Sequence, residues 1–141
     1  LVDDADPDPI WICEELSLCT INDNAKANMT AFTVSPKSGQ QGDTFNVFVT
    51  LQVTNAIGTG EIVFEVNPPQ GDPFGDGGMI LNLAPGLYRY QFQFQAEPSQ
   101  DQPFVPGGYQ VIAAVCEGSC GSTHSHSFTL AERETGFQIT N

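Results

Sequence analysis

The residues best suited to chemistry in this chain are two histidines and four cysteines. His124 and His126 stand two positions apart, which places both rings on one face of a strand, where they could begin a metal site with Cys116 or Cys120 nearby. The same spacing suits ordinary packing on a strand that continues to Phe128, and we favour that interpretation. We therefore expect no metal site and no cofactor.

Motifs of the common enzyme classes are missing from the sequence. It has no GxSxG elbow, HExxH helix, phosphate-binding loop or GxGxxG fingerprint. Ser122 and His124 are neighbours, but proximity along one strand does not create the geometry of a catalytic triad. Asp72 and Asp76 could contribute to a calcium site, yet the EF-hand spacing and its terminal glutamate are missing, which favours a solvated loop. We expect a protein that is not an enzyme and has no catalytic residues.

The cysteines form two close pairs, Cys13 with Cys19 and Cys116 with Cys120. Neither pair has the CxxC spacing of zinc ribbons or redox motifs, and an even count with few lysines favours an oxidising, extracellular compartment. A bridge from Cys116 to Cys120 across a predicted turn is the simplest pairing, which leaves Cys13 for Cys19. Pairings between the two ends of the chain, within one subunit or between subunits, remain open.

Asn28-Met29-Thr30 is a sequon for N-linked glycosylation. It lies ahead of the first predicted strand, where a glycan would stand in solvent. We predict a glycan at Asn28 and a secreted protein.

The charge balance excludes two classes of partner. Four Lys and Arg residues face 17 Asp and Glu residues, and the net charge of -13 argues against nucleic acid and anionic membrane. Six acids fall within the first fifteen residues, which indicates a solvated acidic tail or, alternatively, a calcium-responsive or base-seeking one. No apolar run is long enough to span a bilayer. The chain lacks an initiator Met and a signal peptide, so we expect a mature, processed product.

From residue 30 onward the chain alternates between apolar and polar residues, as strands with one buried face do. The alternation is clearest at 44–54 and 87–96, which we predict as core strands. Weaker strands are expected at 31–34, 61–66, 79–83, 109–116, 123–130 and 136–140. Turn-forming residues separate them, at 36–39, 57–60, 67–69, 75–78, 85–86 and 106–108. Seven or eight short strands and no long helix predict an all-β antiparallel sandwich.

Gly108-Tyr109-Gln110-Val111 resembles the tyrosine corner that immunoglobulin-like domains carry near the start of their sixth strand. The resemblance covers about 30–140 and concerns architecture, because the tryptophan and the inter-sheet cysteine spacing of antibody domains are absent. It implies an immunoglobulin-like antiparallel β-sandwich of 7–8 strands with an extended N-terminal segment. We expect residues 1–28 to form that segment and residues 29–141 to form the sandwich.

The stretch PIWICEELSLC, from Pro9 to Cys19, resembles the closing part of a saposin-like domain, where a proline precedes a C-x5-C helix end. In that family both cysteines pair with partners earlier in the domain, and that earlier part is missing here. The resemblance implies a precursor cut inside a saposin-like module. Lipid binding is not implied, because the helices that form the lipid pocket are absent.

The apolar N-terminal segment has two interpretations. As a strand, Ile10, Ile12, Leu16 and Leu18 share one face and Trp11 lies on the other, so both faces are largely apolar. Such a strand can pair with the open edge of a neighbouring subunit, and repetition of this head-to-tail contact gives a filament. Alternatively, the segment folds back on its own domain as an extra edge strand or a short helix.

We therefore expect a non-enzymatic extracellular structural protein, the subunit of a head-to-tail homopolymeric fibril. Its partner would be a second copy of itself, and the assembly contact would be made by Ile10, Trp11, Ile12, Leu16 and Leu18. The alternative is a secreted monomeric binding module that recognises a carbohydrate or a cell-surface partner. That module would use turns such as 68–78 and exposed aromatic residues such as Phe74 and Phe104.

Overall fold

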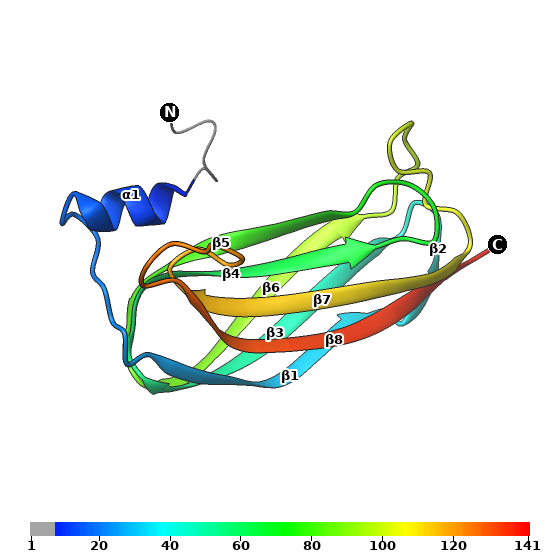
Figure 1. The fold of residues 1–141 in the computed structure, drawn as a ribbon. Coiled ribbons are helices and arrows are strands. Elements are labelled where there is room, and N and C mark those ends of the chain that lie inside the picture. The colour runs from blue at the N-terminus through cyan, green and yellow to red at the C-terminus, as the bar shows by residue number, and fades with distance from the viewer. Residues whose placement is uncertain (1–7) are drawn as a thin grey trace.

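Two β-sheets pack face to face in residues 8–141, the part of the chain that the computed structural model describes (Figure 1). Sheet A has the strand order β1-β3-β6, and sheet B has the order β2-β8-β7-β4-β5. The elements are α1 (Pro9–Glu15), β1 (Lys26–Ser35), β2 (Ser38–Gln40), β3 (Thr44–Asn55), β4 (Ile57–Asn67), β5 (Phe74–Leu83), β6 (Gly86–Gln95), β7 (Gly107–Glu117) and β8 (Phe128–Thr140). The predicted all-β class is confirmed.

The core lies between the two sheets and follows the alternation of the sequence. In β3 every second side chain is buried, and the polar residues between them face outward. The inward side chains of β4 and β7 alternate in the same way from the opposite layer. The buried residues of these three strands include Phe45, Val47, Val49, Leu51, Val53, Ile62, Phe64, Val66, Val111, Ala113 and Val115.

Two tyrosines stabilise turns at the starts of their strands through hydrogen bonds from their hydroxyl groups. The hydroxyl of Tyr109 donates a hydrogen bond to the carbonyl oxygen of Val105, at 2.6 Å, and Tyr88 does the same to Ala84, at 2.7 Å. Each tyrosine follows a Pro-Gly turn and bonds four residues back. The sequence therefore uses one local device twice, once in each sheet.

Four segments of the sandwich differ from the sequence-based expectation. The predicted turn at 57–60 forms the start of β4. The predicted strand at 123–130 is mostly loop, and β8 runs unbroken from Phe128 to Thr140 because its backbone pairs with β7. The glycines at 75–78 were expected to form a turn but lie within β5, where ladder bonds to β4 outweigh their turn preference. Residues 38 and 39, the second half of the turn predicted at 36–39, lie in β2, which pairs in parallel with β8.

Within the N-terminal segment, Pro9–Glu15 forms the helix α1 where the alternation indicated a strand. Asp8 caps α1 by accepting a hydrogen bond from the amide of Trp11, at 3.0 Å, and Pro9 occupies the first turn, where its missing amide costs nothing. This capping sequence outweighs the alternation, so the strand interpretation of Ile10–Ile21 is wrong for this structure. The predicted acidic tail includes Asp3, Asp4 and Asp6, which lie outside the described residues.

In residues 8–141 the structure contains no helix of the length and apolarity needed to cross a membrane.

Candidate functional site

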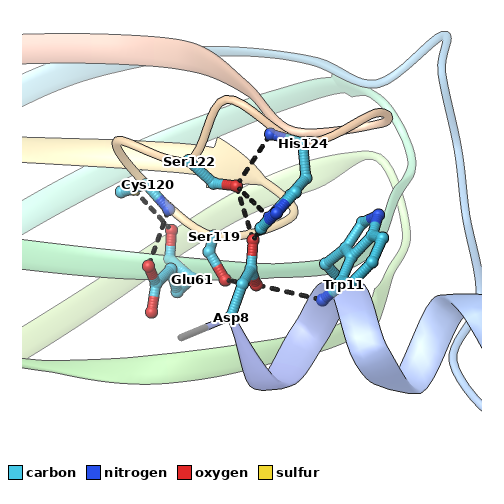
Figure 2. A network of polar contacts seen from close by, with 7 residues as sticks. All are labelled: Asp8, Trp11, Glu61, Ser119, Cys120, Ser122 and His124. Atoms are coloured by element: carbon cyan, nitrogen blue, oxygen red, sulfur yellow. Dashed lines mark hydrogen bonds and ion pairs between the residues drawn. The ribbon is translucent and has the colours of Figure 1, made fainter. Parts of the chain in front are cut away.

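The end of the sandwich that carries α1 holds a polar network centred on Asp8 (Figure 2). Its carboxylate accepts hydrogen bonds from the hydroxyls of Ser119 and Ser122, and it lies 3.1 Å from Nδ1 of His124. Trp11, one turn along α1, stacks on the His124 ring with their centroids 4.3 Å apart. The network therefore joins the start of α1 to the loop between β7 and β8.

The Asp, Ser and His side chains of this network do not form a catalytic triad. The hydroxyl oxygen of Ser122 and the carboxylate of Asp8 both contact the same ring nitrogen, Nδ1 of His124, at 3.2 and 3.1 Å. A triad needs the imidazole between the two, with one nitrogen for each. The arrangement instead docks α1 against the domain.

Hydrogen bonding keeps Asp8 ionised in a buried position. Burial alone would raise the pKa of Asp8, but hydrogen bonds from Ser119, Ser122 and the amide of Trp11, together with His124, lower the pKa to about 2. The carboxylate is therefore charged across the physiological range, and it can satisfy both hydroxyls and the first turn of the helix.

Two further acids are buried under the same end. Glu117 accepts hydrogen bonds from the amides of Gly58, at 2.9 Å, and Asn22, at 3.0 Å, although burial still raises its pKa. Gly58 is required here, because a Cβ would lie 2.8 Å from a Glu117 carboxylate oxygen and from the carbonyl oxygen of Thr20. Neither carboxylate oxygen of Glu14 has a hydrogen-bond partner in residues 8–141, and burial followed by repulsion from Glu117 raises its pKa to about 7.

Both disulfides are local. Cys13 pairs with Cys19 across the end of α1, and Cys116 pairs with Cys120 at the end of β7. This is the pairing that the sequence analysis gave as the simplest, and it differs from the saposin resemblance, in which Cys13 and Cys19 pair with earlier residues. The amide of Cys120 also donates to the carboxylate of Glu61, at 2.6 Å, which ties the second disulfide loop to β4 (Figure 2).

The structure separates the five predicted assembly residues. Ile10 is buried against the domain, and Trp11 and Ile12 are half-buried. Leu16 and Leu18, which follow α1, are exposed. The shared strand face predicted for these residues is therefore absent from the helical segment.

Other residues selected from the sequence do not converge on one site. His124 and His126 lie in a loop rather than on a strand, and each faces a different carboxylate, with Nδ1 of His126 2.7 Å from Asp23. Within residues 8–141 no group of three His, Cys, Asp or Glu side chains is arranged to hold a metal ion. Asn28 lies inside β1 rather than ahead of it, and its side chain is exposed.

The aromatic residues expected to bind a partner belong to the core. Phe104 is only 6% exposed, and Phe74 packs edge-on against Phe104 and Phe94, with ring centroids 5.4 and 5.3 Å apart. The prediction that Phe74 and Phe104 are exposed is wrong, because both rings pack with Phe94 at the hydrophobic core.

A groove of about 720 Å³ opens on sheet B at the end of β7 opposite α1. Two cross-strand pairs form its floor, Gly108 with Gln138 and Gln110 with Gly136, so each glutamine stands across from bare backbone. A Cβ at Gly108 would meet no atom within 4 Å, which means that the missing side chain leaves the groove open. The lining consists of Lys37, Ser38, Gly108, Tyr109, Gln110, Glu134, Thr135, Gly136, Phe137 and Gln138.

The groove offers hydrogen-bonding groups of both kinds. Gln110 donates to the carboxylate of Glu134, at 2.9 Å, and accepts from the side-chain amide of Asn67, at 3.3 Å, so its orientation is fixed. Gln138 and Ser38 add an amide and a hydroxyl, each able to donate and to accept. Sequence analysis missed this site because its residues come from three strands whose pairing leaves no mark in the sequence.

Comparison with known proteins gives relatives over nearly the whole chain. Countin-1 of Dictyostelium discoideum is 46% identical over 139 residues, which cover 99% of this chain and 54% of countin-1. Countin-3 of the same organism is 45% identical over 139 residues, which cover 99% of this chain and 63% of countin-3. The chain thus spans between about half and two thirds of the length of these relatives.

The fold also resembles that of distant solved structures. The C-terminal domain of wzt superposes with a TM-score of 0.62 at 9% sequence identity, over 86% of this chain and 81% of that domain. At this identity the likeness concerns the fold alone. The family description of the countin C-terminal domain matches residues 27–141, nearly all of the sandwich. By this match and by the identity to countin-1 and countin-3, the chain belongs to the countin C-terminal domain family.

Proposed function

We propose that this domain is an extracellular, non-enzymatic recognition module that binds a neutral oligosaccharide in the groove on sheet B. The observation that carries the proposal is the groove floor, where Gln110 and Gln138 flank the bare backbone of Gly108 and Gly136. Two disulfides fit an extracellular location, since such bonds persist in oxidising compartments.

The chemistry of the groove favours a neutral, hydroxyl-rich ligand. Sugar hydroxyls donate and accept hydrogen bonds, as do the amides of Gln110 and Gln138 and the hydroxyl of Ser38. The net charge of -13 disfavours anionic ligands. A volume of about 720 Å³ lies within the range of small-molecule sites.

The test is a screen of neutral and acidic glycans, followed by titration calorimetry with the best neutral glycan. Gly108→Leu should be accommodated without strain, because nothing lies within 4 Å of a Cβ there. Its side chain should fill the groove and abolish binding. Gln110→Ala should weaken binding at least about tenfold by removing an oriented amide. Gln93→Ala, at an exposed glutamine of β6, is the matched control and should bind as the wild type does.

Two outcomes would refute the proposal. One is the failure of every neutral glycan to bind the wild-type protein. The other is unchanged binding by Gly108→Leu, provided that its thermal unfolding shows a folded domain.

We also propose that Asn28 carries an N-linked glycan. Its side chain is exposed on β1, in sheet A, so a glycan there would leave the groove on sheet B free. Mass spectrometry of the peptide containing Asn28, from protein secreted by a eukaryotic host, tests this. The Thr30→Ala variant, which destroys the sequon, should lose the added mass.

Head-to-tail assembly through the N-terminal segment is the second candidate. The exposure of Leu16 and Leu18 beside the Cys13–Cys19 disulfide favours it, because two exposed leucines close together give a second copy an apolar surface to contact. Negative-stain electron microscopy should then show filaments for the wild type and none for Leu16→Ser with Leu18→Ser. Filaments that persist in the double variant would rule this contact out.

A further inference from the structure

The two outer faces of the sandwich differ in charge. The strands of sheet A, β1, β3 and β6, contain no Asp or Glu at all, although the chain has 17 acids. They carry two of its four basic residues, Lys26 and Arg89. Every second side chain of β3 and β6 faces outward from this layer, and most of these are Thr, Asn and Gln.

The outer face of sheet B has the opposite character. Glu61 and Glu65 on β4 alternate with buried residues and point outward, and Glu132 and Glu134 on β8 lie one strand pair away, across β7. Arg133, the only basic residue in the strands of sheet B, instead donates a hydrogen bond to the carbonyl oxygen of Met29 on β1, at 3.2 Å. This face is therefore acidic without basic residues between its acids.

Both faces also expose large apolar side chains. On sheet A, Phe48 is 39% exposed and Leu87 is 53% exposed, on either side of the row that holds Arg89. On sheet B, Met79 and Leu81 are 60% and 61% exposed, and Met79 pairs directly with Glu61. Sheet A thus combines exposed apolar side chains with positive charge, and sheet B combines them with negative charge.

We propose that the outer face of sheet A of one copy packs on the outer face of sheet B of a second copy. The contact would set Phe48, Leu87 and Arg89 of one copy against Met79, Leu81 and the acids of β4 and β8 of the next. Because the two faces are different surfaces on opposite sides of one molecule, the contact is head-to-tail and leaves a free face at each end. Repetition gives an open stack of sandwiches. The contact does not use the N-terminal segment. It covers Glu134, which also lines the groove on sheet B, and Asn28, which lies in the same cross-strand row as Leu87 on sheet A, so it requires an empty groove and an unglycosylated Asn28.

The overall negative charge sets the conditions for the assay. Two copies at -13 repel each other at low ionic strength, but at physiological ionic strength charges further apart than about 8 Å are largely screened. The charges on the touching faces then decide the outcome. Sedimentation velocity over a concentration series at physiological ionic strength is therefore the appropriate measurement.

Two variants block one face each. The face-A variant combines Phe48→Ser with Arg89→Glu, and the face-B variant combines Met79→Ser with Leu81→Ser. All four positions are on outer strand faces, and circular dichroism melting checks that each variant remains folded. Should the face-B variant fail to fold, Glu132→Lys with Glu134→Lys blocks the same face by charge. Phe128→Ser, at a residue of β8 that is 37% exposed, is the matched control.

The expected result is a series of species beyond the dimer for the wild type and for Phe128→Ser, and monomers for each blocked variant alone. An equimolar mixture of the two blocked variants should form dimers and nothing larger, because each retains one working face. The proposal is overturned if the wild type stays monomeric, if either blocked variant assembles alone, or if the mixture forms no dimers. A wild type that stops at a closed dimer would also overturn it.

Discussion

Replacing Glu14 with glutamine should stabilise the docked helix α1 at neutral and alkaline pH and change little in acid. Glu14 is 4% exposed, and neither of its carboxylate oxygens has a hydrogen-bond partner in residues 8–141. Burial and then repulsion from Glu117 raise its pKa to about 7, with Asp8 and Asp23 adding to the repulsion and His126 opposing it. The protonated acid is therefore the form that the docked helix accommodates, and a glutamine mimics it.

The size of the effect follows from the pKa. A rise from 4.5 to about 7 corresponds to at most about 3 kcal/mol against the ionised form. The pKa of Glu14 is higher in the docked state than in the undocked state, so protonation of Glu14 stabilises docking. This stabilisation is complete below pH 4.5 and is lost as the pH rises to about 7. Protonated His126, whose pKa Asp23 raises, favours the ionised form of Glu14 and so reduces the cost of ionisation. We therefore expect Glu14→Gln to stabilise docking by about 1–3 kcal/mol above neutral pH.

Trp11 supplies the assay, because it is the only tryptophan in the chain and lies in α1. Denaturant titrations at about pH 5 and about pH 8, followed by tryptophan emission for the helix and by circular dichroism for the sandwich, give the stability of each. Glu15→Gln, at the exposed neighbouring residue, is the control and should show the wild-type profile. The same pH profile for Glu14→Gln and for the wild type would refute the reasoning.

Three other substitutions test the account of the fold. Asp8→Ala removes the cap of α1 and its bonds to the loop, so the helix should lose about 1–2 kcal/mol of docking stability, read as a red shift of Trp11 emission at lower denaturant. Because the pKa of Asp8 falls from 3.8 to about 2, wild-type docking should also weaken as the pH drops through that window. Tyr109→Phe removes the hydrogen bond to Val105 and should lower the free energy of unfolding in urea by about 1 kcal/mol. An unchanged free energy of unfolding would show that this hydrogen bond does not stabilise the domain. Phe45→Ala should cost about 3–5 kcal/mol in the same assay, and a smaller loss would show that the core rearranges.

Sequence patterns predicted those parts of the fold in which one strand face is buried. β3 and β6 follow strict alternation, and both were predicted nearly to the residue. The prediction divided β8 into strands at 123–130 and 136–140 and left 131–135 out, yet residues 131–135 pair with β7 and Glu132 faces solvent. Pairing between strands therefore decided what local composition could not.

The two candidate sites depended on information of different kinds. The helix cap was readable from Asp8-Pro9, and a short helix folded back on its own domain was among the alternatives that the sequence left open. The groove was not readable, because Gln110 and Gly136 become neighbours only through the pairing of β7 with β8. Likewise, the docking of Trp11 on His124 joins residues that are far apart in the sequence.

The most direct test of the proposed function is a nuclear magnetic resonance titration of the isotope-labelled domain with the best neutral glycan from the screen. We predict saturable shifts of the backbone amides of Gly108, Gln110, Gly136 and Gln138, with amides of sheet A unmoved. Absence of saturable shifts, or shifts centred away from this groove, would contradict the assignment of saccharide recognition to it.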